Sequence, residues 1–308
     1  MPAVLEFQDI IKDYRAIFRR RTVRALDHFT LQVEEGEIFG FLGPNGAGKT
    51  TAIHLAMGFV QPTRGRGLMF GKRFGHAATR RKVGFLAENV ALYHRPAEKL
   101  VRFYGALNGL SGEKLSSRTK AALAVVNLTH ESTRNVSKFS RGMLQRIGLA
   151  QAIVHDPDLL ILDEPTSALD PLARYAVREM LLDWRRRGKT IFLSSHLLSE
   201  VELVCDRIAV LNQGRLVRLG RPADLLESHA TFEVVASGVR PEAFAGAEVQ
   251  PGGRIRVQVS KQDQRALIEQ IWLAGGQIMS VTGHKRSLED LFLELTGGNV
   301  ESSTQGTR

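Results

Sequence analysis

The segment Gly43-Pro44-Asn45-Gly46-Ala47-Gly48-Lys49-Thr50 constrains the fold of this chain more than any other stretch. It fits the P-loop pattern G-x-x-x-x-G-K-[ST] at every fixed position. The run 37–42 before it predicts a short buried strand, and residues 51–57 after it predict a helix. Glycines let successive backbone N–H groups turn inward, and the helix N-terminus adds partial positive charge. This strand–loop–helix unit therefore predicts a site for the phosphates of a nucleoside triphosphate.

The residues of this loop have separate predicted roles. Lys49 is expected to reach the β- and γ-phosphates, and the Thr50 hydroxyl is expected to ligate Mg²⁺. A Gly-rich turn that matches by chance is the alternative, and the strand and helix on either side argue against it. The loop alone does not indicate what the energy of the nucleotide drives. The further residues expected to contact the nucleotide are Gly43, Asn45, Gly46, Ala47, Gly48 and Thr51.

Length and composition describe a globular chain. Its 308 residues are enough for a large core and two domains, and the 43% hydrophobic and 24% charged residues are ordinary for soluble proteins. No apolar run approaches the ~18–20 residues that a membrane span needs. Met1–Glu6 shows no basic region followed by an apolar one, so no signal peptide is predicted. Cys205, the single cysteine, excludes an intramolecular disulfide, fits a cytoplasmic site and is expected to be a small core residue.

The formal net charge is +10, and basic residues cluster at 19–21, 80–82 and 185–187. Such a balance can favour nucleic acid or the anionic inner face of a membrane. Each cluster is short and none is interleaved with aromatic residues, so solvated polar faces are the expected reading. Charge alone does not choose a partner, and no nucleic-acid partner is expected.

The order of the apolar patterns predicts an α/β protein with a P-loop NTPase core and a mixed sheet. Strands are predicted at 4–10 and 26–33, and a loop at 61–67 from its Gly and Pro content. From Arg95 to Gln151 the apolar residues recur at helical spacing, which predicts an inserted helical subdomain at about 89–155. The whole ATPase-type domain is predicted to span residues 1–228.

A shift in composition near 228–230 predicts a boundary to a small C-terminal α+β domain at 229–297. Alternating strands are predicted at 231–236, 254–259 and 277–281, and a helix at 262–273. Ser287-Leu288-Glu289-Asp290 resembles a capping box and predicts the start of a second helix. We find no constellation of catalytic residues in this part. Residues 298–308 are polar and are predicted to be disordered.

Acidic and aromatic side chains complete the predicted nucleotide site. The apolar run Leu159–Leu162 predicts a strand buried on both faces and ends in Asp163 and Glu164. Asp163 is expected to hold Mg²⁺, usually through water, and Glu164 to orient and polarise the attacking water. His196 ends the neighbouring predicted strand and is expected to meet the γ-phosphate; a structural histidine is the alternative. Tyr14 is the candidate for stacking on the nucleobase, with Phe18 as its alternate and a core aromatic as the other reading.

Five motifs in a fixed order resemble the nucleotide-binding subunit of ATP-binding cassette (ABC) transporters, over roughly residues 4–228. Gly43–Thr50 matches the Walker A motif and Leu159–Glu164 the Walker B motif. Phe139–Met143 matches the signature that separates this family from other P-loop ATPases. Ser167–Asp170 matches the D-loop, and His196 matches the switch histidine.

Two motifs depart from the family pattern. The signature usually ends in Gly-Gly-Gln, and here it reads Arg141-Gly142-Met143, while Ser140 before it and Gly142 within it are retained. The glutamine of the family's Q-loop falls at Glu88, whose carboxylate is expected to contact Mg²⁺ or water. Both departures, and the tail Ser287–Thr296, are similar to what exporter-type cassettes carry.

The resemblance implies a mechanism and partners. Two cassettes, as a homodimer or a paired cassette, would sandwich two ATP molecules, with Ser140 and Gly142 of one capping the γ-phosphate held by the other. Asp170 is also implied to contact nucleotide. The helical region would carry the resulting motion to transmembrane permease subunits, so the chain is expected to lie peripherally at the cytoplasmic face of the cell membrane. The cofactors implied are ATP and Mg²⁺.

Two other classes of protein are weighed against this one. A soluble ABC-type mechanochemical ATPase acting on ribosomes or DNA usually has two tandem cassettes or a long coiled-coil insertion, whereas this chain has one P-loop and no long heptad run. The signature and the D-loop argue against a P-loop kinase or GTPase. The transported substrate does not follow from the sequence, because its recognition would belong to permease subunits.

Overall fold

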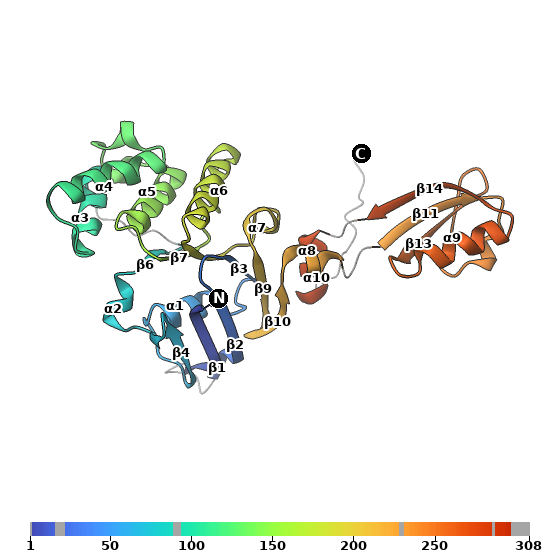
Figure 1. Ribbon diagram of the computed structural model, residues 1–308, viewed down its shortest axis with the longest axis horizontal. Coiled ribbons are helices and arrows are strands. Elements are labelled where there is room, and N and C mark those ends of the chain that lie inside the picture. Colours follow the sequence, from blue (N-terminus) through green and yellow to red (C-terminus); the bar gives the residue numbers. More distant parts are fainter. Residues whose placement is uncertain (1, 16–21, 89–93, 228–230, 285–286, 297–308) are drawn as a thin grey trace. The chain divides into compact units, whose positions relative to one another are not determined.

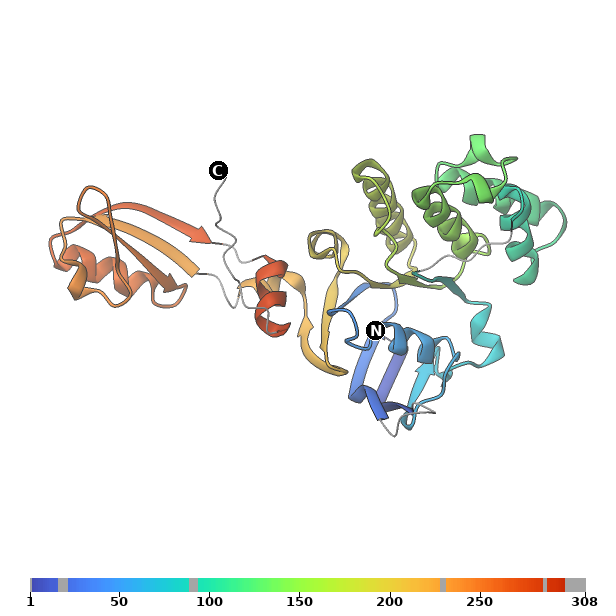
Figure 2. The same cartoon turned by 180° about the vertical axis from the view of Figure 1, so that it is seen from behind.

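The computed structural model describes residues 2–15, 22–88, 94–227, 231–284 and 287–296. The chain divides into two compact units, Met1–Gly220 and Arg221–Arg308, which are described one at a time (Figures 1 and 2). The boundary predicted at 228–230 and the tail predicted at 298–308 lie outside the described residues. Among the residues described, none of the helices combines the length and the apolar character needed to cross a bilayer.

The first unit is built on a six-stranded sheet with the order β10-β9-β3-β8-β7-β6. Five strands are parallel, and β10 pairs antiparallel with β9, so the sheet is mixed as predicted. Every residue of β3, β7 and β8 is buried, which explains why these strands read as continuous apolar runs. The strands are β3 (Ile38–Leu42), β6 (Val83–Leu86), β7 (Leu159–Asp163), β8 (Thr190–Ser194), β9 (Arg207–Asn212) and β10 (Arg215–Gly220).

A second, antiparallel sheet has the order β2-β1-β4-β5. Its strands are β1 (Ala3–Arg15), β2 (Thr22–Glu34), β4 (Arg64–Met69) and β5 (Lys72–Arg73). The loop predicted at 61–67 is wrong from Arg64 onward, because β4 begins there. A Cβ on Gly65 would lie 2.2 Å from the Asp9 carbonyl oxygen, and one on Gly67 would lie 1.8 Å from the Phe74 ring. These glycines permit close packing within a sheet, so they do not mark a loop.

Helices cover both faces of the six-stranded sheet. Helix α1 lies on the side of β1, β2 and β4, whereas α5 and α6 lie on the opposite side (Figures 1 and 2). Helices α3, α4 and α5 pack on one another in the region predicted to be helical. The helices of this unit are α1 (Lys49–Ala56), α2 (Ala77–Arg80), α3 (Ala97–Leu107), α4 (Gly112–Val125), α5 (Arg141–Ile153), α6 (Pro171–Arg186) and α7 (Leu198–Val204), with single 3₁₀ turns at Thr129–Glu131 and Val136–Lys138.

Cys205 follows α7 and is buried, as expected of a small core residue. Its sulfur lies close to β3, since a Cβ built on Gly40 would be 2.9 Å from Sγ. Burial raises the pKa of the Cys205 thiol well above its ordinary value, and the nearby carboxylates of Asp206 and Glu37 act in the same direction. The thiol is therefore a packing group of the first unit.

The second unit joins helices to an antiparallel sheet of order β12-β13-β11-β14, which fits the predicted α+β character. Val234, Ala236, Ile255 and Val257 of the sheet form its core with Leu267 and Ile271 of α9. The predicted capping box is present: Asp290 N donates to Ser287 Oγ over 3.2 Å, and Ser287 N donates to Asp290 Oδ2 over 3.0 Å. The elements are α8 (Pro222–Glu227), β11 (Thr231–Ser237), a 3₁₀ turn (Pro241–Ala243), β12 (Glu248–Gln250), β13 (Arg254–Ser260), α9 (Gln264–Leu273), β14 (Gln277–His284) and α10 (Leu288–Thr296).

Candidate functional site

The phosphate loop, Gly43–Thr50, connects the end of β3 to the start of α1. Gly46 and Gly48 adopt positive φ angles of 80° and 110°, which favour glycine. A Cβ on Gly48 would lie 2.4 Å from the Ala25 carbonyl oxygen, and one on Gly43 would lie 2.5 Å from the Leu211 carbonyl oxygen. Packing against β2 and β9 thus leaves no room for side chains at two of the loop glycines.

The turn between β9 and β10 forms a hydrogen bond with the phosphate loop. Gly214 N donates to the Ala47 carbonyl over 2.8 Å, and Asp27 N donates to the Gly214 carbonyl over 3.0 Å. The Asp27 carboxylate in turn accepts hydrogen bonds from Arg215 Nε at 2.6 Å and Arg24 Nη1 at 3.0 Å, and these bonds hold the pKa of Asp27 below its ordinary value. The loop is therefore tied to the turn between β9 and β10, which is far from it in sequence, and through that turn to β2.

Lys49 is buried at the base of the loop, with 8% of its surface exposed. Its Nζ donates to the Gly43 carbonyl at 2.5 Å and to the Pro44 carbonyl at 3.2 Å. Burial lowers the pKa of Lys49, and three carboxylates oppose this by favouring the charged amine: Glu164, Asp163 and Glu88. The structure therefore brings the three predicted acidic residues around the predicted phosphate-binding lysine.

The other loop residues predicted to contact nucleotide differ in exposure. Asn45, Gly46 and Thr50 are exposed, and Thr51 is half-buried. Gly43, Ala47 and Gly48 are buried against the strands described above. The rim of the loop is thus open where a phosphate and its metal ion would approach.

Asp163 ends β7 and is 3% exposed. Its Oδ1 accepts a hydrogen bond from the Ser194 hydroxyl over 2.5 Å, and Ser194 Oγ also accepts the Glu164 N–H over 3.2 Å. Ser194 therefore binds the carboxylate of Asp163 and the backbone of Glu164, a role that the sequence analysis did not assign. The available signal was the position of a hydroxyl residue at the end of the neighbouring strand, directly opposite Asp163 in the parallel register.

Glu164 is held in a set orientation. Its backbone has a φ of 53°, a left-handed conformation that is uncommon for a non-glycine residue and clusters at functional sites. Its Oε2 lies 2.7 Å from His196 Nδ1 and accepts the His196 N–H over 3.4 Å. The two residues predicted to act on the γ-phosphate and its attacking water are thus in direct contact.

Gln145 is a second residue that the sequence analysis missed. It lies on α5, is 4% exposed, and its Nε2 donates to the Glu164 carbonyl over 3.0 Å. It therefore connects the helix that begins within the signature directly to the backbone of Glu164, the candidate catalytic residue. A polar amide among the apolar residues of a buried helix face was the only signal in the sequence.

The predicted metal donors fit Mg²⁺ in their chemistry. Thr50, Glu88 and Asp163 offer hydroxyl and carboxylate oxygens, which are the hard ligands this ion takes. Asp163 is buried yet forms no ion pair within the described part of the chain, which suits a carboxylate that faces a cation. The residues described include no group of three or more His, Cys, Asp or Glu able to hold a metal alone. Mg²⁺ sites that combine one or two carboxylates with water and substrate phosphates need no such group.

The signature residues and the D-loop lie beside each other. Ser140 Oγ accepts the Met143 N–H over 3.3 Å, so Ser140 is the N-cap residue of α5. A Cβ on Gly142 would lie 3.3 Å from the Ala168 carbonyl of the D-loop, and Asp170 caps α6 through a 2.8 Å bond from Ala173 N. Within the described ranges, no hydrogen bond joins Ser140 or Gly142 to the phosphate loop. The chain does not bring these predicted nucleotide contacts onto its own phosphate loop.

Tyr14 lies near the end of β1, opposite Val23 of β2. Its ring is 39% exposed, so it is not a core aromatic, and Lys12 Nζ lies 4.8 Å from the ring centre. Stacking of Tyr14 on a nucleobase stays a prediction. Its alternate, Phe18, lies outside the described residues.

Comparisons with known proteins agree with these motifs. The family profile described as ABC transporter matches residues 26–167. An uncharacterized ABC transporter ATP-binding protein of Nostoc sp. is 38% identical over 300 residues, covering 95% of this chain and 89% of the relative. The Nod factor export ATP-binding protein I of Cupriavidus metallidurans is 36% identical, covering 92% of this chain and 98% of the relative. A solved ATP-binding subunit of an ABC transporter is 31% identical with a TM-score of 0.66, over 72% of this chain and 91% of that structure.

Proposed function

This chain belongs to the ABC transporter ATP-binding family, whose members bind and hydrolyse ATP, and we propose that it drives a separate transmembrane permease that exports its substrate. The observation that carries the proposal is the arrangement of Glu164, locked against His196, beside the loop that holds Lys49. Export is supported by the tail Ser287–Thr296 and by the relative that is named for Nod factor export. The relatives are named as transporter subunits, which gives no support to a soluble ATPase acting on ribosomes or DNA.

Each residue of the site has a role in this proposal. Lys49 binds the β- and γ-phosphates within the phosphate loop, and Tyr14 stacks on the base. Glu164 accepts a hydrogen bond from the attacking water and orients it, while His196 holds the Glu164 carboxylate and faces the γ-phosphate. Thr50, Asp163 and Glu88 would hold Mg²⁺, which when bound neutralises charge on the phosphates.

Two cassettes are needed to complete the site in this proposal. Ser140, at the N-terminus of α5, is exposed and makes no hydrogen bond to the phosphate loop of its own chain within the described ranges. A helix N-terminus favours phosphate oxygens, so Ser140 and Gly142 are suited to cap a γ-phosphate held by a second cassette. Asp170, the last residue of the neighbouring D-loop, approaches the same nucleotide. ATP is then part of the interface, and its hydrolysis releases the two cassettes.

The hydrogen bond from Gln145 to Glu164 supports transmission of this event. It joins the site of water attack to α5, which packs on α3 and α4 of the helical region. We propose that this region passes the movement to permease subunits, which would hold the chain peripherally at the cytoplasmic face of the membrane. The proposal includes no nucleic-acid partner.

The test uses the variant Glu164→Gln, which keeps the shape of the side chain and removes its charge. Hydrolysis should stop while ATP stays bound, and bound ATP should shift the protein to a dimer by mass action. Adding Ser140→Arg places a bulky side chain at the proposed interface, so this double variant should bind ATP and remain a monomer. Light scattering with and without MgATP measures whether the protein is a monomer or a dimer. If the isolated subunits associate weakly, the measurement is repeated with the permease present.

A matched control adds Ser117→Arg to Glu164→Gln instead. Ser117 is exposed on α4 and belongs neither to the signature nor to the D-loop, so this double variant should dimerise with ATP. A Glu164→Gln protein that binds ATP but stays monomeric at high concentration, with its permease present, would argue against the shared site. Continued hydrolysis by Glu164→Gln would remove Glu164 from its proposed role.

A further inference from the structure

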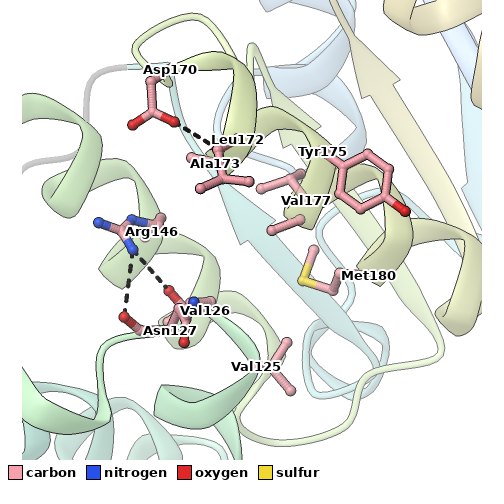
Figure 3. A pocket seen from close by; sticks show the side chains of 11 residues that line it. Val125, Val126, Asn127, Arg146, Asp170, Leu172, Ala173, Tyr175, Val177 and Met180 are labelled. Atoms are coloured by element: carbon pink, nitrogen blue, oxygen red, sulfur yellow. Dashed lines mark hydrogen bonds between the residues drawn. The ribbon is translucent and has the colours of Figure 1, made fainter.

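A groove of about 370 Å³ lies between the helical region and α6, apart from the residues of the phosphate loop. Figure 3 shows Arg146 and the end of α4 on one side of it and side chains of α6 on the other. Three of its apolar side chains are open to solvent: Leu172 is 80%, Tyr175 53% and Val125 47% exposed. Val177 and Met180 form a buried floor.

Arg146 supplies a cation to this groove. The rest of the chain gives its guanidinium few hydrogen bonds. Its Nη1 reaches the carbonyls of Val126 and Asn127 only over 3.4 and 3.5 Å, and its buried Nε has no hydrogen-bond partner. Across the described residues, Arg146 pairs with no carboxylate. Asp170 also borders the groove, but its Oδ1 caps α6. A guanidinium without an acidic partner favours a carboxylate or sulfonate.

We propose that this groove binds an amphipathic organic anion, whose acidic group pairs with Arg146 and whose apolar body lies along Tyr175 and Met180. Its volume falls in the range of small-molecule sites, which are mostly apolar and carry a few placed polar groups. The ligand would contact α5 and α6 together. Ser140 and Asp170 are the N-cap residues of these helices, so occupancy would bridge two segments that the proposed ATP site requires. The groove itself is a second site and does not depend on nucleotide.

The test compares two probes of similar shape by titration calorimetry on the full chain: naphthalene-1-sulfonate and the neutral 1-naphthalenemethanol. The sulfonate should bind at least about tenfold more tightly, because a charge-assisted hydrogen bond contributes about 1.5–3 kcal/mol. Arg146→Met should abolish this preference and leave the affinity of the neutral probe within about twofold, as expected if only the charge is lost. Equal affinities of the two probes for the unmodified protein, or no binding of either at millimolar concentration, would overturn the proposal.

A second variant keeps the test decisive if Arg146→Met does not fold. Ala176 is exposed on α6 and borders the groove, so Ala176→Trp should fill it and block both probes. Leu203→Trp places the same side chain on the exposed face of α7, outside the groove, and should leave both affinities unchanged. Unchanged sulfonate binding in Ala176→Trp would refute the assignment. Neither measurement uses ATP, so these results stand apart from the proposed ATPase function.

Discussion

One cluster of charged side chains from each compact unit shows two different ways of placing charges. In the first unit, Asp163 and Lys49 are buried near each other, and neither forms a close ion pair within the described residues. In the second unit, Arg256 pairs with Glu233 and lies 3.8 Å from Glu248, on the sheet. The first arrangement leaves charges that can act on phosphate and metal, whereas the second satisfies its charges internally. A fold can provide a binding site where it holds buried charges near each other without pairing them in close ion pairs.

Loss of Lys49 should have the largest effect, because it removes the cation from the buried charged cluster of the first unit. Lys49→Ala removes the only side-chain cation of the phosphate loop, so MgATP affinity should fall by at least about a hundredfold, since each charged hydrogen bond contributes about 1.5–3 kcal/mol. Hydrolysis should be abolished. Calorimetry measures the affinity, and Lys114→Ala, an exposed lysine of α4, is the control that should bind normally. Unchanged affinity in Lys49→Ala would remove the loop from the proposed site.

A pair of glycine variants separates the backbone of the loop from its side chains. Gly48→Ala introduces a Cβ 2.4 Å from the Ala25 carbonyl at a φ of 110°, so it should cost about 3 kcal/mol or more and impair ATP binding. Gly46→Ala meets open space at a φ of 80° and should cost only about 1–2 kcal/mol. Thermal unfolding and ATP titration measure both. Equal losses in the two variants would show that packing against β2 does not shape the loop.

The sequence locates elements of this site where the signal is local. The phosphate loop and the acids at the end of β7 each depend on a few consecutive residues. Ser194 and Gln145 were missed because their roles depend on which strand or helix lies next to Glu164 in space. The fold shows the same limit: the glycines of β4 predicted a loop, because close approach of Asp9 and Phe74 is not visible in the sequence.

Core variants test whether the two units are energetically separate. Ile271 and Ile161 are both fully buried, one in α9 of the second unit and one in β7 of the first. Each change to alanine should destabilise its own unit by about 2–5 kcal/mol. Hydrogen exchange should increase in β11 for Ile271→Ala with ATP affinity unchanged within about twofold, whereas Ile161→Ala should weaken ATP binding. Loss of ATP binding in a folded Ile271→Ala protein would show that the site depends on the second unit.

The smallest expected effect is an exchange of protons when ATP binds. Burial lowers the pKa of Lys49 below its ordinary value of 10.5 in the free protein, so the amine begins to lose its proton at a lower pH than an exposed lysine does. Phosphate oxygens favour the charged amine and raise this pKa, so ATP binding should take up a fraction of a proton that grows as the pH rises toward the lowered pKa of the free protein. Calorimetry in buffers of different ionisation enthalpy measures the uptake. Lys114→Ala should show the same uptake as the unmodified protein, since its amine is exposed. Proton release on binding, or uptake that does not change with pH, would contradict a buried Lys49 that carries the phosphate contact.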